Sequence, residues 1–497
     1  MQIEPRHSIY VDSEITGSFI VDAELSNIHG TPHSNISVSS NSSELDFTIM
    51  VESSSEILVQ DKININTTNN LFEFDLSQLE ARFEAYTIIL RAGTGYRNRS
   101  YTATTKLFYL PDKTLGSVTK IDNLYGGMLF KNNVTNNEFI PLLAYGFYTN
   151  YGGYLDLSLE NVQLYVDMGF NAIHPIPSFS PNLTRIFDYA DEVNLLWQYD
   201  MRGTYQNLTS VAEQVMLVKD YTSLFAYYTA DEPDGWQDPL NSTKLAYGTI
   251  TALDKYHPVG IALNCQDFYF DEYTRGADYI MEDAYPVGIN ATYSIPWNTP
   301  CNETYGDCGC DNCLGKLQDV PDRLNDYTEY QELLGQWRKP LWAVPQSFSE
   351  PGNYWARDPS ADEAWVMNAL SFNHNAKSIM IWTYPTSNEL ADAHAKMAKV
   401  VTVSPVLDFL IGANPIPITV DSVPHLDVAY WICGSQIMII VANPEYTAVE
   451  MVSIMLPLNP SHITSQPWGS VDWSLKDGYL EAGTLLALST SIILVDL

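Results

Sequence analysis

Basic residues are scarce in this chain, which carries 25 Lys and Arg against 60 Asp and Glu, a formal charge of −35 over 497 residues. A surface this negative repels nucleic-acid phosphates and anionic lipids, so we expect neither as a partner. Long apolar runs are also missing, and a membrane span needs about 20 apolar residues, so we expect no membrane helix. The first residues, MQIEPRHSIYVD, contain no apolar stretch either, and we expect a mature form without a leader.

Motifs of cofactor and nucleophile chemistry are absent as well. No Gly-rich phosphate loop follows the first expected strand of the central region, and no Gly-x-Ser-x-Gly elbow occurs. His, Asp and Glu do not cluster with a metal-ligand spacing. The sequence therefore predicts no cofactor and no metal, and leaves chemistry performed by the protein's own side chains.

Glycosylation sequons, by contrast, are frequent. One Asn-x-Ser/Thr tripeptide arises easily by chance, but a large set favours a secreted eukaryotic glycoprotein with N-linked glycans. The acceptor asparagines are Asn35, Asn41, Asn66, Asn98, Asn133, Asn182, Asn207, Asn241, Asn290 and Asn302.

Four of the six cysteines lie within CNETYGDCGCDNC, at Cys301, Cys308, Cys310 and Cys313. This density is compatible with a zinc site. In a secreted chain, however, such a cluster more often ties down a loop with disulfides, and that is our prediction. The pairing of the two isolated cysteines, Cys265 and Cys433, stays open.

Hydrophobic patterning divides the chain into three regions. Residues 1–118 alternate apolar and polar positions over short runs separated by turns, as in a β-sandwich. Residues 119–408 alternate short apolar strands with helical stretches, the pattern of a (β/α)8 TIM barrel, with a Cys-rich insertion at 288–317. Residues 409–497 return to short strands and predict a second, smaller β-sandwich.

Eight strands are expected in the central region, and a doubly wound open sheet is the competing fold. The expected strands are 139–148, 169–179, 194–201, 223–233, 258–265, 277–287, 340–348 and 378–385. The expected helices include 157–169, 208–221, 360–376 and 389–401. In the last region we expect strands at 418–422, 426–434, 436–444, 448–457 and 490–497.

The carboxyl ends of barrel strands form the active site of such folds. In this chain those ends carry acids, amides and aromatics, a mixture that suits a sugar, because rings stack on its C–H faces and polar groups bond its hydroxyls. The expected substrate-binding residues are Tyr148, His174, Asp200, Asp231, Tyr285, Gln346, Trp382 and Tyr384, with Gln198 at the end of strand three. Structural roles as hydrogen-bond partner, cap or core residue are the open alternatives for His174, Asp200, Trp382 and Tyr384.

Two acids at strand ends are the candidate catalytic pair. Glu232 closes strand four in YYTADEPDGW, where it can donate a proton to a leaving oxygen. Glycosidic cleavage needs a second carboxylate, and MEDAYP supplies one from strand six, which we expect roughly across the barrel. Adjacent acids raise each other's pKa, which helps to keep one protonated. Because strand residues alternate, only one of Glu282 and Asp283 should point inward.

These motifs resemble a known group of barrels, the retaining glycoside hydrolases that place Asn-Glu-Pro at the end of strand four. The sequence is closer to related barrels with Asp-Glu-Pro on strand four, Asp-x-Tyr-Pro on strand six and Gln on strand seven. The matching segments are DEP at 231–233, DAYP at 283–286 and Gln346. The resemblance covers the barrel only.

The resemblance implies that Glu232 is the acid/base. Those retaining enzymes usually carry their nucleophilic Glu at the end of strand seven, where this chain has Gln346. The resemblance therefore favours Asp283 as nucleophile, then Glu282, then Glu350. We predict a secreted glycosidase with a carbohydrate substrate. A transglycosylase, or a non-catalytic carbohydrate-binding protein on the same barrel, are the alternatives.

Overall fold

A computed structural model describes residues 1–30, 44–93, 100–177, 182–302 and 308–497, so three sequon asparagines, Asn35, Asn41 and Asn98, lie outside the described residues. None of the helices in these ranges is long and apolar enough to cross a membrane. The chain divides into two compact units, and the proposed domain boundaries at 118 and 408 stay predictions. The first unit is 1–114, 120–126 and 331–338, and the second is 115–119, 127–330 and 339–497.

The first unit contains a β-sandwich, as residues 1–118 predicted. Alternation along the strands places apolar side chains such as Phe19, Ile49 and Leu90 in one shared core. The four-stranded sheet has the order β5-β4-β7-β8, the three-stranded sheet β1-β3-β6, and β2 pairs with β9. Their bounds are β1 (Gln2–Pro5), β2 (Tyr10–Val11), β3 (Thr16–Asp22), β4 (Glu44–Val51), β5 (Ile57–Asn64), β6 (Asn70–Asp75), β7 (Tyr86–Gly93), β8 (Ser100–Leu107) and β9 (Tyr109–Leu110).

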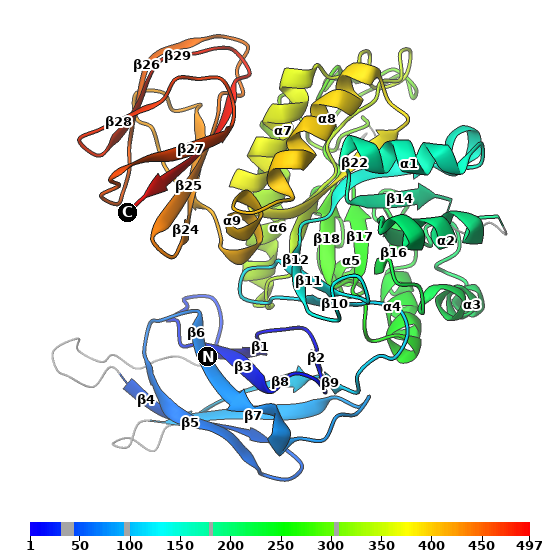
Figure 1. Cartoon of the computed structure of the whole chain (residues 1–497), viewed down its shortest axis with the longest axis vertical. Helices are drawn as coiled ribbons and strands as arrows, with labels where there is room; N and C mark the ends of the chain where they lie inside the picture. Colours follow the sequence, from blue (N-terminus) through cyan, green and yellow to red (C-terminus); the bar gives the residue numbers. More distant parts are fainter. Residues whose placement is uncertain (31–43, 94–99, 178–181, 303–307) are drawn as a thin grey trace. The chain divides into compact units, whose positions relative to one another are not determined.

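The second unit is built on a closed barrel of eight parallel strands, which confirms all eight expected strands and excludes the open sheet (Figure 1). Two short antiparallel strands, β11 (Met128–Lys131) and β12 (Ile140–Leu142), precede it. In order around the barrel, its strands are β13 (Tyr145–Asn150), β14 (Ala172–Ile176), β15 (Leu196–Asp200), β16 (Leu224–Asp231), β17 (Val259–Leu263), β18 (Tyr279–Glu282), β21 (Leu341–Ala343) and β22 (Ala376–Tyr384).

Helices surround the barrel, and their apolar faces share one core with the outward side chains of the strands (Figure 1). Four of them, α1, α3, α7 and α8, confirm the helices expected from periodicity. A capping box of Ser360 and Glu363 begins α7. The bounds are α1 (Leu159–Met168), α2 (Thr184–Val193), α3 (Leu208–Val218), α4 (Ser242–Leu253), α5 (Phe270–Thr274), α6 (Asp319–Leu334), α7 (Ala361–Asn373), α8 (Asn388–Val401) and α9 (Val406–Gly412).

The insertion after strand six contains a short hairpin of β19 (Tyr293–Ser294) and β20 (Thr299–Pro300). Its four cysteines pair as Cys301–Cys308 and Cys310–Cys313, in agreement with the disulfide prediction. The other two cysteines, Cys265 and Cys433, are free thiols.

The C-terminal region forms the second β-sandwich, with sheet orders β23-β24-β25-β30-β27 and β26-β29-β28 around a core of its own. The expected strand at 418–422 is wrong, because the pairing there involves only Ile416 and Pro417. Three strands were not expected, β27 to β29, because their sequences are polar and interrupted by Pro or Gly. The bounds are β23 (Ile416–Pro417), β24 (Asp427–Cys433), β25 (Gln436–Ala442), β26 (Val449–Met455), β27 (His462–Trp468), β28 (Ser474–Lys476), β29 (Tyr479–Leu485) and β30 (Thr490–Asp496).

A glycine substitution tests how tightly the barrel closes. A Cβ on Gly146 in β13 would lie 1.7 Å from the carbonyl oxygen of Ala172 in β14. We expect Gly146→Ala to lower the free energy of unfolding by at least about 2 kcal/mol, measured in urea. The matched control is Gly248→Ala in α4, where a Cβ meets nothing within 4 Å, and there we expect a gain of about 0.5–1 kcal/mol. Equal midpoints for the two variants would contradict the packing of β13 on β14.

Candidate active site

Two carboxyl groups meet at the carboxyl ends of β16 and β18. Glu232 follows β16 in the left-handed region, with φ +51°, and its N–H donates to the carbonyl of Ala262 at 3.1 Å. Its Oε1 accepts a hydrogen bond from Asn264 Nδ2 at 3.2 Å. A side-chain hydrogen bond joins the carboxyls of Glu232 and Asp283. Two carboxylates cannot donate to each other, so such a bond forms only when the pair holds a proton.

Strand alternation explains why Asp283 and not Glu282 is in the pair. Met281 points into the barrel, where its sulfur accepts a hydrogen bond from the Tyr148 hydroxyl. Asp283, two residues later, points to the same side. Glu282 points outward, accepts from the Ala284 N–H at 3.0 Å, and lies near the positive charge of Arg323 in α6. The structure therefore places Asp283, and not Glu282, beside Glu232, and the catalytic role of Glu282 stays a prediction.

Burial sets the protonation of the pair. Removal from water raises the pKa of Glu232 to about 7, and the negative charge of Asp231 adds to this shift. Burial also raises the pKa of Asp283 well above its ordinary value, with the charge of Glu232 as the next cause. Asp283 is only 4% exposed. At neutral pH the two groups are thus able to retain one proton between them.

The position of strand six differs from the prediction. Only β17 separates β16 from β18 in the barrel, so these strands do not face each other across it. The carboxyls of Glu232 and Asp283 are consequently in hydrogen-bond contact. Asn264, just after β17, completes the group.

Arg202 organises the neighbouring charges and was not predicted. Its Nη1 lies 2.5 Å from Asp231 Oδ2, and its Nε lies 2.6 Å from Asp200 Oδ2. The Tyr228 hydroxyl donates to the other oxygen of Asp231 at 2.5 Å. Burial alone would raise the pKa of Asp200, but Arg202 and His174 together lower it. The sequence signal was an arginine two residues beyond the acid that ends strand three.

His174, Asp200 and Tyr148 form a buried floor under Arg202. The ring nitrogens of His174 lie 3.0 Å from Gln198 Oε1 and 2.7 Å from Asp200 Oδ2. The ring stacks on Tyr148 with a centroid distance of 4.0 Å. Both nitrogens are therefore engaged, in line with the alternative that His174 and Asp200 are hydrogen-bond partners, and their role in substrate binding stays a prediction.

The two aromatic residues of strand eight point to opposite sides. Trp382 lies toward the site, 5.2 Å from the Tyr148 ring and 5.3 Å from the Arg202 guanidinium carbon. Tyr384 packs outside the barrel against Tyr165 of α1 and against Phe147, in line with the alternative of a core residue, and its role as a sugar platform stays a prediction. The register of β22 against β13 shifts by one extra residue before Tyr384, which turns its side chain to the other face.

The residues that follow strand seven bind to neighbouring loops. The Gln346 amide accepts from the Val287 N–H at 2.9 Å and donates to the carbonyls of Val287 and Phe348, so it is engaged by the main chain. Its role in substrate binding stays a prediction. Glu350 is exposed and accepts a hydrogen bond from Asn353 at 2.6 Å. Tyr285 packs edge-on against Phe348, with the charges of Asp283 and Glu232 among the causes that raise its pKa.

A clamp around Asn264 was also missed by the sequence reasoning. Arg323 donates from one side of its guanidinium to the Asn264 carbonyl and from the other to the Asp311 carbonyl. Asp234 accepts from the N–H groups of Asn264 and Cys265. The side chain of Asn264 is thereby fixed where it meets Glu232. These residues come from different elements, so no local motif announced them.

Comparison with known proteins gives likeness of fold. No protein-family model and no curated protein matches the chain. The solved structures similar to it include the following three. A GH30 endoxylanase from Clostridium papyrosolvens is 13% identical, over 72% of this chain and 97% of that chain, with a TM-score of 0.45. The debranching enzyme of Nostoc punctiforme is 12% identical over 67% and 88%, with a TM-score of 0.45, and an Anoxybacillus alpha-amylase is 10% identical over 71% and 97%, with a TM-score of 0.44.

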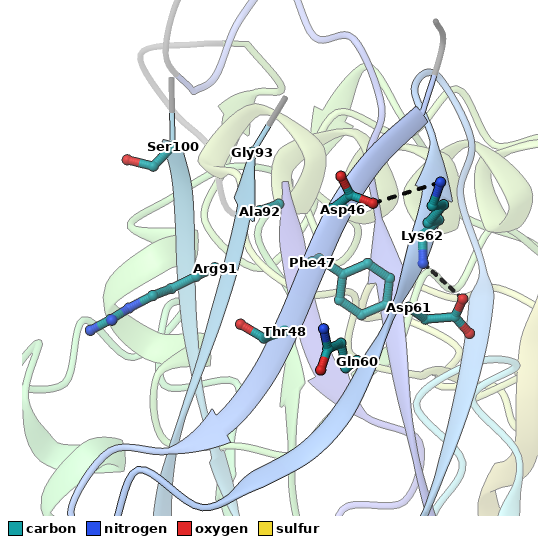
Figure 2. A pocket seen from close by; sticks show the side chains of 10 residues that line it. All are labelled: Asp46, Phe47, Thr48, Gln60, Asp61, Lys62, Arg91, Ala92, Gly93 and Ser100. Carbon is teal, nitrogen blue, oxygen red and sulfur yellow. Dashed lines mark hydrogen bonds and ion pairs between the residues drawn. The ribbon is translucent and has the colours of Figure 1, made fainter. Parts of the chain in front are cut away.

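A hollow of about 660 Å³ lies elsewhere, on the outer face of the four-stranded sheet of the first unit (Figure 2). Its lysine, Lys62, lies 3.8 Å from Asp46, so opposite charges balance there. It contains no hydrogen-bonded pair of buried acids, and we place no chemistry in it. Over the described ranges, no three His, Cys, Asp or Glu side chains are arranged to hold a metal ion.

The buried proton predicts how stability depends on pH. Since the pKa of Glu232 rises from 4.5 to about 7 on folding, the folded state keeps a proton that the unfolded state releases, and stability falls as pH rises through this range. Glu232→Gln should therefore raise the free energy of unfolding by about 1–3 kcal/mol at pH 8 and by nothing at pH 4. Urea unfolding at both pH values measures this. The exposed control Glu350→Gln should change neither, and a Glu232→Gln gain that is equal at both pH values would contradict the assignment.

Proposed function

We propose that this protein hydrolyses glycosidic bonds of an oligo- or polysaccharide, with Glu232 as the proton donor and Asp283 as the second carboxylate. The observation that supports this most is the pair of buried acids at the mouth of the barrel, where burial raises the pKa of Glu232 to about 7 and that of Asp283 well above its ordinary value. A general acid must still be protonated at its working pH, and a pKa near 7 meets that need.

The reaction begins when Glu232 gives its proton to the leaving-group oxygen. The carboxylate of Asp283 stabilises the positive charge that develops at the anomeric carbon, and it attacks that carbon to form a covalent glycosyl-enzyme intermediate. Glu232 then takes a proton from the water that attacks the same carbon and releases Asp283. The carboxyls touch in the free protein, so a sugar must separate them. A separation of about 5–5.5 Å is the smaller movement, and it corresponds to retention of configuration.

Groups beside the pair are suited to hold the sugar. Asp231 is the more accessible acid, with its side chain 26% exposed, and Arg202 keeps it in place. Trp382 presents its ring from β22 and Tyr285 stands two residues after Asp283. We propose that Asp231 bonds a sugar hydroxyl and that Trp382 and Tyr285 contact the C–H faces of the ring.

We also propose that the protein is secreted and carries N-linked glycans. All seven sequon asparagines within the described ranges are exposed, which an oligosaccharide transferase requires. Two disulfides in the insertion support an oxidising compartment.

Matched variants test the assignment of the acids, with a panel of aryl glycosides and polysaccharides as substrates. Glu232→Gln should lose about 10²–10⁴-fold in kcat, because the proton donor is gone. Asp283→Asn should lose a comparable factor, whereas Glu282→Gln, on the other face of the same strand, should keep its kcat. Loss in Glu282→Gln with an active, folded Asp283→Asn would reverse the assignment. Binding without any turnover by the unaltered protein would favour the non-catalytic alternative.

The configuration of the first product tests the movement of the pair. Proton NMR during the first minutes of hydrolysis should show the anomer of the substrate, because the smaller separation of Glu232 and Asp283 gives a covalent intermediate. Transfer to added methanol should accompany hydrolysis, since that intermediate accepts other hydroxyls. The opposite anomer would show that a water enters between the two groups. Transfer that greatly exceeds hydrolysis would identify a transglycosylase.

A further inference from the structure

Five aromatic rings connect the carboxyl pair to the Cys-rich insertion. They are defined here as the ridge and consist of Tyr285, Phe348, Trp355, Tyr354 and Trp297. Consecutive ring centroids lie 5.1, 4.9 and 5.2 Å apart along the first four. The indole N–H of Trp297 then donates to the Tyr354 hydroxyl at 2.8 Å. The rings come from the loops after strands six and seven, so the ridge is continuous although its sequence is not.

The inner end of the ridge belongs to the candidate site. Tyr285 follows Asp283 by two residues and is 6% exposed. Burial raises the pKa of Tyr285, and the charges of Asp283 and Glu232 add to this effect. The Trp355 indole donates to the Tyr285 carbonyl at 2.9 Å, so the second loop is fastened to the strand that carries Asp283.

The outer end of the ridge is open to solvent and is supported by the disulfide loop. Trp297 is 62% exposed, unusually high for so large an apolar side chain. Gly309, between the two disulfides, has φ +80° and lies so close to Tyr354 that a Cβ would be 2.6 Å from its ring. The Cys-rich insertion therefore holds Tyr354 and Trp297 in place. A rigid aromatic with an exposed face is a binding surface for the C–H face of a sugar.

We propose that the ridge binds an uncharged glycan chain that extends outward from the carboxyl pair over several sugar units. This rests on the proposed function, which it deepens by naming the substrate class as a polymer without acidic groups. The chain's charge of −35 disfavours a polyanion on any exposed face. The ridge extends from the buried Tyr285 to the exposed Trp297, so a polymer can reach its outer end, whereas a disaccharide would reach only the inner end.

The test separates binding from turnover. In a Glu232→Gln background, affinity gel electrophoresis is run with xylan, mixed-linkage glucan, mannan and amylose, and with polygalacturonate as the anionic comparator. We expect at least one uncharged polymer to be bound, Trp297→Ala to weaken its binding about tenfold, and Trp297→Phe to restore most of it. The control Tyr479→Ala, an exposed tyrosine of the C-terminal sandwich, should bind as the parent does.

The outcomes distinguish the two proposals. With Glu232 intact, Trp297→Ala should leave cleavage of a short aryl glycoside unchanged and slow that of the bound polymer. Polymer binding that depends on Trp297 without any cleavage would support the ridge and contradict the hydrolase. The ridge proposal would be overturned if the protein cleaves the polymer but Trp297→Ala binds it as well as the parent does. Binding of polygalacturonate, or binding of no polymer at all, would also overturn it.

Discussion

Closure of eight parallel strands into a barrel is the constraint on which the site depends. Closure brings every strand's carboxyl end to one rim, and alternation fixes which side chains face inward. At the end of β18 this turns Asp283 toward Glu232 and sends Glu282 to the helix layer. Two acids from non-adjacent strands thus meet in a place from which water is largely excluded, and there they must share a proton.

Neighbouring charged and polar side chains stabilise the pair of Glu232 and Asp283. Arg202 neutralises Asp200 and Asp231, so the cluster of acids carries a fixed counter-charge. Arg323 holds the carbonyl of Asn264, whose amide donates to Glu232. Buried acids with raised pKa values lower stability at neutral pH, and the large barrel core compensates for this loss. The site therefore lowers the free energy of unfolding at neutral pH, and it keeps a carboxyl group that is able to donate a proton.

The sequence predicted what depends on local pattern. Apolar alternation located the barrel strands, and the positions of Glu232 and Asp283 after strands four and six followed from it. Features that depend on register or on distant residues were not predictable. The face on which Tyr384 lies depends on one extra residue in β22, and the contacts of Gln346 depend on the main chain of another loop. Arg323 reaches the site from α6, far beyond Glu232 in the sequence, and no motif surrounds it.

The central claim is that Glu232 and Asp283 share a single proton in the free protein. Neutron diffraction from deuterated crystals at neutral pH tests it most directly. The account predicts one deuteron between the two carboxyl groups, within hydrogen-bond distance of both, and an Asn264 amide directed at Glu232. Two separated carboxylates without a deuteron, or a deuteron on each acid with no bond between them, would contradict it.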